Sequence, residues 1–486
     1  MNRVIKHLII IIFLTLFLSN CEKDEPISNV INEQIEAFIN VNLVPMTDDN
    51  VFTNQTVLIK GTRIIEIGQS HEVDIPDDIN VFDCEGTYLM PGLADMHMHT
   101  RDDWTDNRWP VSPLKLYLAN GVTTIRDFGP NGDDLTYTLG WRDEIDEGTL
   151  VGPMLYTSGL RPGHPSASGQ DPQSIVQWNH TQGFDFLKVY SYISYADFIE
   201  LMTTADQLGI YTSGHIPYPI GLDGVIAAGL NELAHIEELD WEFVEFNRDT
   251  VFAWDEWLPY IIGSIIQQID ISSDFNPGQF QADYGDKLAT VNSILLANNI
   301  PLCTTLIVSA LIVEKLFEPE NFLSRPELIY MPQDYLTAFN HGTEKHQQQF
   351  LGIEDLANYK YGLDRMLLDE LHRAGVPLLL ATDAGTATMG IVPGFSIHDE
   401  LSLLVENGFT PYEAITAGTV NASKVVEAMI GEDNFGTIEV GKRADFILVN
   451  VNPLENVAFV KDIRGVMAAG VWYSRETLDN MLAVED

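Results

Sequence analysis

The stretch GLADMHMH, residues 92–99, is a short apolar run that ends in two alternating histidines. Side chains two positions apart on an extended segment leave the same face, so His97 and His99 are expected to point the same way. A histidine pair at this spacing is weak evidence alone, because two core or surface histidines can share it. The stretch therefore predicts a buried strand that ends in two imidazoles, which leads to the runs that follow it.

Seven further apolar runs follow, with helical patterns such as residues 194–209 and 358–375 between them. This alternation is the signature of βαβ units and a parallel sheet. The eight runs occupy residues 92–97, 121–128, 153–159, 184–190, 209–215, 231–236, 300–308 and 376–383. They predict an α/β fold, a (β/α)8 TIM-type barrel. The long gaps 236–300 and 308–376 are expected to carry insertions that cap the barrel mouth.

Residues 35–90 and 433–486 have a different texture, with short strands and turns. In the first, QTVLIKGTRIIEIG at residues 55–68 predicts a hairpin, because two β-branched runs meet at a Lys-Gly turn. A chain that leaves a β-rich module, runs through a barrel and returns must bring both ends together. We therefore predict a small β-sandwich domain built from the N- and C-terminal segments, beside a barrel domain at residues 91–432.

The first residues are typical of a secretory signal. A positively charged start precedes the apolar run 8–18, which is too short for a comfortable membrane span. LSNC at residues 18–21 resembles a bacterial lipobox, in which the cysteine is diacylated and becomes the mature N-terminus. We expect a signal peptide at residues 1–20, lipidation at Cys21 and a tether at 21–34; the alternative is an ordinary cleaved signal or a short anchor.

The charged stretch EKDEP after Cys21 resembles the acidic export tags that send some lipoproteins to the outer face of the outer membrane. An exported protein, lipid-anchored to the cell envelope at the outer membrane, is therefore expected. Lys and Arg number 26 against 71 Asp and Glu, for a formal net charge of −45. Such a surface repels phosphates, so nucleic acid is not an expected partner. We expect a solvated acidic surface screened by counter-ions, and a basic partner or a cation store is the alternative.

The chain has three cysteines, too few for a disulfide framework. Cys84 and Cys303 lie in apolar runs and are interpreted as small core residues, and nothing in the sequence supports a bridge between them.

Polar residues stand where the predicted barrel strands end, which is where the active site of a parallel barrel lies. Each histidine alone is more often a satisfied core residue than a ligand. The set is His97, His99, Lys188, His215, His235 and Asp383. Chance is a poor explanation for six such residues on one rim. Together they supply nitrogen and carboxylate ligands suited to Zn²⁺ or a similar divalent ion.

Lys188 interrupts the apolar run FDFLKVY. Lysine is almost never fully buried unless it is paired or modified. One interpretation is a side chain that extends to solvent at the barrel rim. The other is an amine that has taken up CO2, because the resulting carbamate is an anionic oxygen ligand able to bridge two cations. Asp383 follows five apolar or small residues, so it should be costly there unless it meets a cation or a proton.

These motifs resemble, in order, those of the amidohydrolase superfamily. PGLADMHMHT is similar to its first-strand histidine motif, FLKVY to its carbamylated-lysine strand, TSGHIP and LAHIEE to its strand-five and strand-six histidines, and LLLATDAGT to its aspartate motif. The resemblance covers about residues 38–475 and is nearest to the imidazolonepropionase-like and metallo-dipeptidase (prolidase-type) subgroup. One departure is LAH where the family often has IEH, with Glu237 and Glu238 after the histidine.

The resemblance implies two divalent metal ions, expected to be Zn²⁺. The implied ligands are His97, His99 and Asp383 for one ion, His215 and His235 for the other, and carbamylated Lys188 between them. Two cations would lower the pKa of a shared water and polarise the scissile carbonyl. Asp383 would accept a proton from that water and pass it to the leaving amine.

The implied function is hydrolysis of amide C–N bonds through this bridging water, above all in small peptides such as Xaa-Pro dipeptides, because the protein is expected to be exported. The alternatives are hydrolysis of a cyclic amide, as in imidazolonepropionase, of a lactone or of an organophosphate ester, and an inactive surface binding or scaffold protein. Rim-loop residues that could contact substrate are Tyr190, His164, Tyr218 and Arg161. His398 and Glu400 would either orient the site from behind or pack helices. Homo-oligomer formation is left open.

Overall fold

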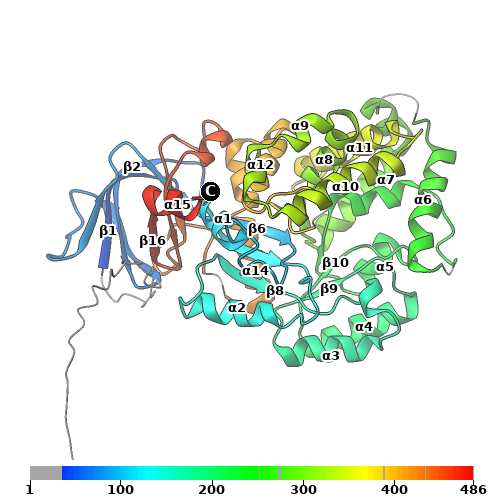
Figure 1. The fold of residues 1–486 in the computed structure, drawn as a ribbon, viewed down its shortest axis with the longest axis horizontal. Coiled ribbons are helices and arrows are strands. Elements are labelled where there is room, and N and C mark those ends of the chain that lie inside the picture. The colour runs from blue at the N-terminus through cyan, green and yellow to red at the C-terminus, as the bar shows by residue number, and fades with distance from the viewer. Residues whose placement is uncertain (1–34, 251, 272–274, 387–388, 433, 485–486) are drawn as a thin grey trace, which may run out of the picture.

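The computed structural model describes residues 35–484, apart from residues 251, 272–274, 387–388 and 433. The expected signal peptide, the tether and Cys21 lie outside the described residues. A β-rich part occupies one end of the molecule and a larger α/β part the other (Figure 1). Among the described helices, none combines the length and the apolar character that crossing a membrane requires.

Eight short parallel strands form the centre of the larger part. They are β6 (Leu93–Met98), β7 (Val122–Asp127), β8 (Met154–Thr157), β9 (Leu187–Val189), β10 (Thr212–Gly214), β11 (Glu232–Leu233), β12 (Leu302–Cys303) and β13 (Leu378–Leu379). Hydrogen bonds group them into two sheets, with the orders β6-β7-β8 and β13-β12-β11-β10-β9. Seven of the strands lie inside a predicted apolar run, and β6 extends one residue beyond its run, because a strand buried on both faces needs a continuous apolar sequence.

The two sheets are joined at both edges by hydrogen bonds outside their ladders. At one edge, Met96 of β6 donates its N–H to the carbonyl of Leu380, 3.0 Å away. At the other, the N–H of Asp185 donates to the carbonyl of Thr157 at 2.9 Å. The α/β arrangement of TIM-barrel type is therefore built from two sheets that meet at their edges, in place of one continuous closed sheet.

Helices surround these strands, with α3 and α4 on one side and α8 and α10–α12 on the other (Figure 1). Those between and after the strands are α1 (Pro113–Ala119), α2 (Tyr137–Asp146), α3 (Pro172–Gln182), α4 (Tyr195–Leu208), α5 (Gly221–Ala227), α12 (Ser396–Glu406), α13 (Pro411–Ala417) and α14 (Val420–Ile430). The first long gap holds the 3-10 segment η2 (Ile236–Phe243) with α6 (Trp254–Gln268) and α7 (Pro277–Ala297). The second holds α8 (Leu306–Phe317), α9 (Pro319–Leu323), α10 (Gln333–Gln349) and α11 (Asp355–Ala374).

One predicted run, residues 300–308, is only partly a strand. Strand β12 ends at Cys303, and helix α8 begins at Leu306. The carboxylate of Glu400 accepts the N–H groups of Leu306 and Ile307, at 3.0 and 2.7 Å, and so satisfies the first turn of the helix. A buried strand and a buried helix are both apolar, so the run itself gave no sign of the change.

The β-rich part contains strands from both ends of the chain. They are β1 (Ile35–Leu43), β2 (Phe52–Lys60), β3 (Arg63–Gln69), β4 (Asn80–Asp83), β5 (Tyr88–Pro91), β14 (Phe446–Val449), β15 (Ile463–Ala468) and β16 (Val471–Ser474), followed by helix α15 (Arg475–Met481). β2 and β3 pair antiparallel, which confirms the predicted hairpin. β5 pairs antiparallel with β14, so the two terminal segments share one sheet.

A single sheet replaces the predicted β-sandwich. All eight strands belong to it, in the order β16-β15-β14-β5-β1-β2-β3, with β4 beside β1. The sheet curls around its own core: the ring of Phe38 on β1 lies 4.9 Å from that of Trp472 on β16, although three strands separate them in the order. Strand pairing depends on contacts between distant segments, which strand texture alone does not encode. Cys84 in this core and Cys303 on β12 are both buried free thiols.

Candidate metal centre

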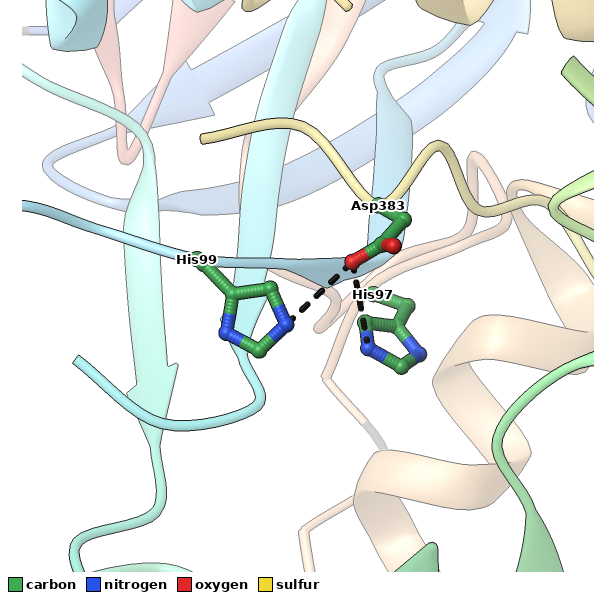
Figure 2. Close-up of side chains that lie close together, drawn as sticks. All are labelled: His97, His99 and Asp383. Carbon is green, nitrogen blue, oxygen red and sulfur yellow. Dashed lines mark ion pairs between the residues drawn. The ribbon is translucent and has the colours of Figure 1, made fainter. Parts of the chain in front are cut away.

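His97, His99 and Asp383 come together where β6 and β13 end (Figure 2). The Nε2 atom of His99 lies 3.2 Å from Oδ1 of Asp383, and that of His97 lies 3.7 Å from it. Asp383 has a positive φ of 58°, and its N–H donates to the carbonyl of His97 at 2.7 Å. A non-glycine residue in this conformation is strained, and such strain clusters at functional sites. Nitrogen and oxygen ligands about 2.0–2.1 Å from a tetrahedral ion lie about 3.3 Å apart, close to these spacings.

The rings of His97 and His99 are fixed from behind by backbone carbonyls. Nδ1 of His97 lies 3.0 Å from the carbonyl of Ala234, and Nδ1 of His99 lies 2.9 Å from that of Gly129. A carbonyl only accepts hydrogen bonds, so Nδ1 carries the proton and Nε2 keeps its lone pair. Nε2 of the fully buried His97 has no hydrogen-bond partner within the described chain. Both rings therefore have the tautomer that a metal ligand needs.

His215 and His235 continue the same group of imidazoles. His215 follows β10, and its Nδ1 contacts both the carboxylate of Glu238 and Oγ of Ser191, the latter at 2.9 Å. His235 follows β11, and its Nδ1 lies 3.3 Å from Oγ1 of Thr305. The ring of His235 is 4.3 Å from that of His97 and 5.0 Å from that of His215. The four imidazoles thus form one cluster, each held through Nδ1.

Lys188 lies in the middle of β9 and is only 1% exposed, so the interpretation that it extends to solvent is wrong. Its Nζ has no hydrogen-bond partner among the residues that the structure describes, and it lies 4.8 Å from the ring centre of Phe128, on which His97 stacks. Burial lowers the pKa of Lys188 to about 7, against the opposing effect of Asp383 and Glu238. A large share of the amine is therefore neutral at neutral pH, the form that reacts with CO2.

The donor set fits divalent metal ions. It combines four imidazoles, a carboxylate and a buried amine without a partner, and a buried polar group without a partner is costly in a finished core. The structure brings together all six residues that the sequence singled out: His97, His99, His215 and His235 through ring contacts, Asp383 through its contacts with two of them, and Lys188 through Phe128.

Two buried acids support this cluster and were not assigned a role from the sequence. Asp95 accepts hydrogen bonds from the N–H and the hydroxyl of Thr382, at 3.1 and 2.6 Å, and so fixes the residue before Asp383. Burial raises the pKa of Asp95 to about 7. Glu238 accepts the N–H of Ile216 at 2.9 Å and contacts His215. Both had a sequence signal, since Asp95 stands within the first-strand motif and Glu238 follows His235 closely.

Three of the four candidate substrate contacts lie beside the centre: Tyr190, His164 and Arg161. The ring of Tyr190 is 4.3 Å from that of His215, and the ring of His164 is 4.8 Å from that of Tyr190. Burial lowers the pKa of His164 to about 3, with Arg161 as the next cause, so its imidazole is neutral. Tyr218 differs, because its buried ring packs against Trp257 and Trp241 in an aromatic cluster.

A cavity of about 710 Å³ opens next to these residues. Its walls include His164, Tyr192, Phe252 and Trp257. Pockets of this size commonly enclose small molecules.

His398 and Glu400 lie behind the site, and only Glu400 is connected to one of the candidate ligands. Nε2 of His398 lies 3.0 Å from the carbonyl of Asn120, which fastens α12 to the end of α1. Glu400 holds the start of α8, next to Thr305, the residue that contacts His235. Glu400 thus supports the site through Thr305, whereas His398 packs helices.

Fold and site together define a class: an α/β protein of TIM-barrel type with a histidine-rich candidate metal centre at the carboxyl ends of its strands. Residues 314–473 match the model of the Amidohydrolase family. The chain therefore carries an amidohydrolase-family segment, which contains Asp383 and lies after the four histidines.

Curated relatives share parts of this sequence, and solved structures share its fold. Over 105 residues the chain is 34% identical to a dihydroorotase of Carboxydothermus hydrogenoformans, which is 21% of this chain and 24% of that enzyme. Over 97 residues it is 35% identical to an imidazolonepropionase of a Shewanella species, 19% of this chain and 21% of the other. The match thus spans about a quarter of these relatives. A crystal structure of a Xaa-Pro dipeptidase with bound methionine has a TM-score of 0.62 and 17% identity, and the match covers 91% of this chain and 100% of that one. This likeness shows the fold.

Proposed function

We propose that this protein is a metal-dependent hydrolase that cleaves amide-type C–N bonds. The observation that carries the proposal is the cluster of four imidazoles held through Nδ1 around a buried lysine without a partner and a carboxylate at the mouth. Perturbed ionisable groups gathered in this way usually mark a functional site. The amidohydrolase-family segment and the enzymes among the curated relatives support the same class.

In this proposal His97, His99 and Asp383 hold one divalent ion and His215 and His235 another, with Lys188 between them as a carbamate. Zn²⁺ suits these nitrogen and oxygen donors. When bound, the two ions would supply Lewis acidity that polarises a carbonyl and acidifies water. The carbamate would bring negative charge and two oxygens into the centre, where a protonated ammonium would repel both cations.

Asp383 is the residue that we assign to proton transfer. Its side chain is 19% exposed, more than that of either neighbouring histidine, so it faces both the ligand cluster and the mouth. A carboxylate in this position can take a proton from water and pass it to the leaving amine. His99, 3.2 Å away, and the backbone bond to His97 keep the carboxylate in place.

We propose small peptides of the Xaa-Pro dipeptide type as substrates. The cavity beside the centre has room for a dipeptide, and the fold is shared with a Xaa-Pro dipeptidase structure. Cyclic amides are the second candidate, because the curated relatives are named dihydroorotase and imidazolonepropionase. A panel of dipeptides, cyclic amides, lactones and phosphotriesters, assayed with Zn²⁺-loaded protein, separates these substrate classes.

Substitution of Lys188 tests the proposal. Lys188→Ala should lose metal and lower turnover about a thousandfold or more, since several kcal/mol of charge stabilisation go with the centre. Acetate or propionate should restore part of both by filling the vacated space, and Lys188→Arg should not recover, because guanidinium stays charged and takes up no CO2. Elemental analysis and turnover are measured side by side, with the exposed Lys424→Ala as control.

Two results would count against the proposal. Retention of two metals and near-parental turnover by Lys188→Ala would contradict the bridged centre. Absence of metal from the parent, purified without chelators, would favour an inactive binding or scaffold protein.

We further propose that the protein is exported and anchored by a lipid on Cys21, at the outer membrane. LSNC behind a short apolar run supports this. Cys21→Ala should leave the membrane fraction after cell fractionation, while Cys84→Ala, a change of a buried core thiol, should stay in it. A Cys21→Ala protein that remains with membranes as firmly as the parent would refute the anchor.

A further inference from the structure

The side chain of Arg161 is fixed beside the metal centre. It is half-buried and lies directly on Gly129, where a Cβ would come within 2.4 Å of its Cδ. Gly129 has a φ of +128°, a conformation that favours glycine, and its carbonyl holds Nδ1 of His99. The backbone that positions a candidate metal ligand therefore also leaves the space that Arg161 fills.

Arg161 has no ion-pair partner in the described chain, although the carboxylates of Asp127 and Asp383 favour its charged form from beyond ion-pair distance. Its guanidinium makes neither a hydrogen bond nor an ion pair with any described residue, although acidic residues outnumber basic ones by 71 to 26. Other arginines around the barrel do pair, Arg126 with Glu232 and Arg248 with Glu242. Burial of an unpaired charge is costly. In agreement, burial lowers the pKa of Arg161, and no neighbouring charge offsets that effect fully.

A phenol and an imidazole, both able to donate to an anion, stand beside Arg161. The backbone N–H of His164 donates to the carbonyl of Arg161 at 3.1 Å, and the neutral ring of His164 stands perpendicular to that of Tyr190, 4.8 Å away. Tyr190 contacts His215 on one side, while His164 lines the 710 Å³ cavity on the other. Guanidinium, phenol and imidazole thus gather between the centre and the cavity. The planar fork of an arginine matches a carboxylate in a two-point pair.

We propose that Arg161 pairs with the free terminal carboxylate of the substrate, assisted by Tyr190 and His164, so that the enzyme acts on amide bonds next to such a carboxylate. This rests on the proposed function and deepens it by naming the substrate class. Dipeptides and N-acyl amino acids belong to the class, whereas end-blocked peptides and neutral amides do not. The leaving amine then carries the carboxylate that Arg161 holds.

The test compares leucyl-proline with leucyl-prolinamide, which differ only in the terminal charge. The parent should prefer the free acid by about a hundredfold in kcat/KM, the range expected for a charge-assisted pair that is partly shielded from water. Arg161→Met, similar in length but neutral, should bring the ratio near one, chiefly through KM for the acid. Arg161→Lys should keep an intermediate ratio, because ammonium is a point charge. Arg373→Met removes an exposed arginine that already pairs with Asp369 and Glu370, and it should leave the parental ratio.

A binding measurement separates failure of this inference from failure of the proposed function. If the metal-loaded parent hydrolyses neither compound, the proposed dipeptidase activity fails. Calorimetric titration with hippurate and hippuramide then decides the inference: hippurate alone should bind, and only when Arg161 is present. Equal handling of acid and amide by the parent would overturn the inference, as would a parental preference retained by Arg161→Met. A loss of metal by Arg161→Met would overturn it too, because the arginine would then balance the charge of the centre.

Discussion

Two polar centres lie within the barrel, and both touch Phe128. One is the ion pair of Arg126 on β7 with Glu232 on β11, and the other is the candidate metal centre around Lys188. The pair is complete: the guanidinium also donates to the carbonyl of Met96 at 2.9 Å, and Glu232 accepts from Tyr211 and Ser213 at 3.1 Å each. In the metal centre, by contrast, His97 Nε2 and Lys188 Nζ lack a hydrogen-bond partner in the described chain.

Burial alone therefore does not distinguish the two centres, since Lys188 is as enclosed as Arg126 and Glu232. The two centres differ in whether their polar groups have hydrogen-bond partners. A network whose members all have partners rigidifies the core, whereas converging groups without partners lower stability unless a ligand completes them. The first centre is accordingly interpreted as structural and the second as a site that binds something.

The largest effect on the free energy of unfolding is expected from substitution in the Arg126–Glu232 ion pair. Glu232→Gln leaves Arg126 as a buried charge without a counter-ion and should reduce the free energy of unfolding by about 3–5 kcal/mol. The double variant Arg126→Met/Glu232→Met should recover much of that loss, because it removes both charges. Urea unfolding of the three proteins measures this. A Glu232→Gln variant as stable as the parent would remove the distinction between the two centres.

A substitution in the candidate metal centre is expected to raise the free energy of unfolding once the metal has been removed. After metal removal with a chelator, Lys188→Met should be more stable than the parent by about 1–3 kcal/mol, since a buried amine without a partner is replaced by an apolar side chain of similar length. The same urea unfolding experiment with added Zn²⁺ should reverse the order, because only the parent binds the metal tightly. A chelated Lys188→Met protein less stable than the parent would show that the lysine serves the core.

The smallest effect on stability is expected at His398, a buried histidine that belongs to neither centre. His398 also has a buried ring nitrogen, Nδ1, without a partner among the described residues, but no other ligand converges on it. Burial lowers its pKa to about 3, so the folded protein keeps it neutral, whereas the unfolded chain takes up a proton below about pH 6.5. Stability is therefore lost as pH falls. His398→Gln should remove about 1 kcal/mol of the loss between pH 7 and pH 5.5.

Thermal or urea unfolding of parent and His398→Gln at the two pH values measures this difference. An unchanged pH slope would mean that His398 is already protonated in the fold. Metal content should be parental in the variant, because His398 contacts Asn120 and not the imidazole cluster.

Much of the barrel and of the site could be predicted, for physical reasons. Strands enclosed on both faces leave apolar runs, and each of the eight central strands overlaps one. The six candidate ligands stand out because histidine, lysine and aspartate are unusual at the ends of such runs. Asp95 and Glu238 stand equally near, but an acid beside a ligand looks like any other acid until its contacts are known.

What the sequence did not reveal depends on distant contacts. Arg126 and Glu232 belong to different strands, and neither residue carries a local sign of the other. The curling of the β-rich part into one sheet depends on the pairing of β5 with β14, which also lies beyond any local pattern. Arg161, which forms no ion pair among the described residues, is a further case, because an unpaired charge can be recognised only after its neighbours are placed.

The pairing of β5 with β14 also limits the order in which parts of the chain can fold during synthesis. β5 precedes the barrel and β14 follows it, so the hydrogen-bonding edge of β5 stays open until the end of the chain has been synthesised. A nascent chain emerges from its N-terminus, and parts whose partners come last fold last. The curled sheet therefore cannot close before the C-terminal segment of the chain has been synthesised.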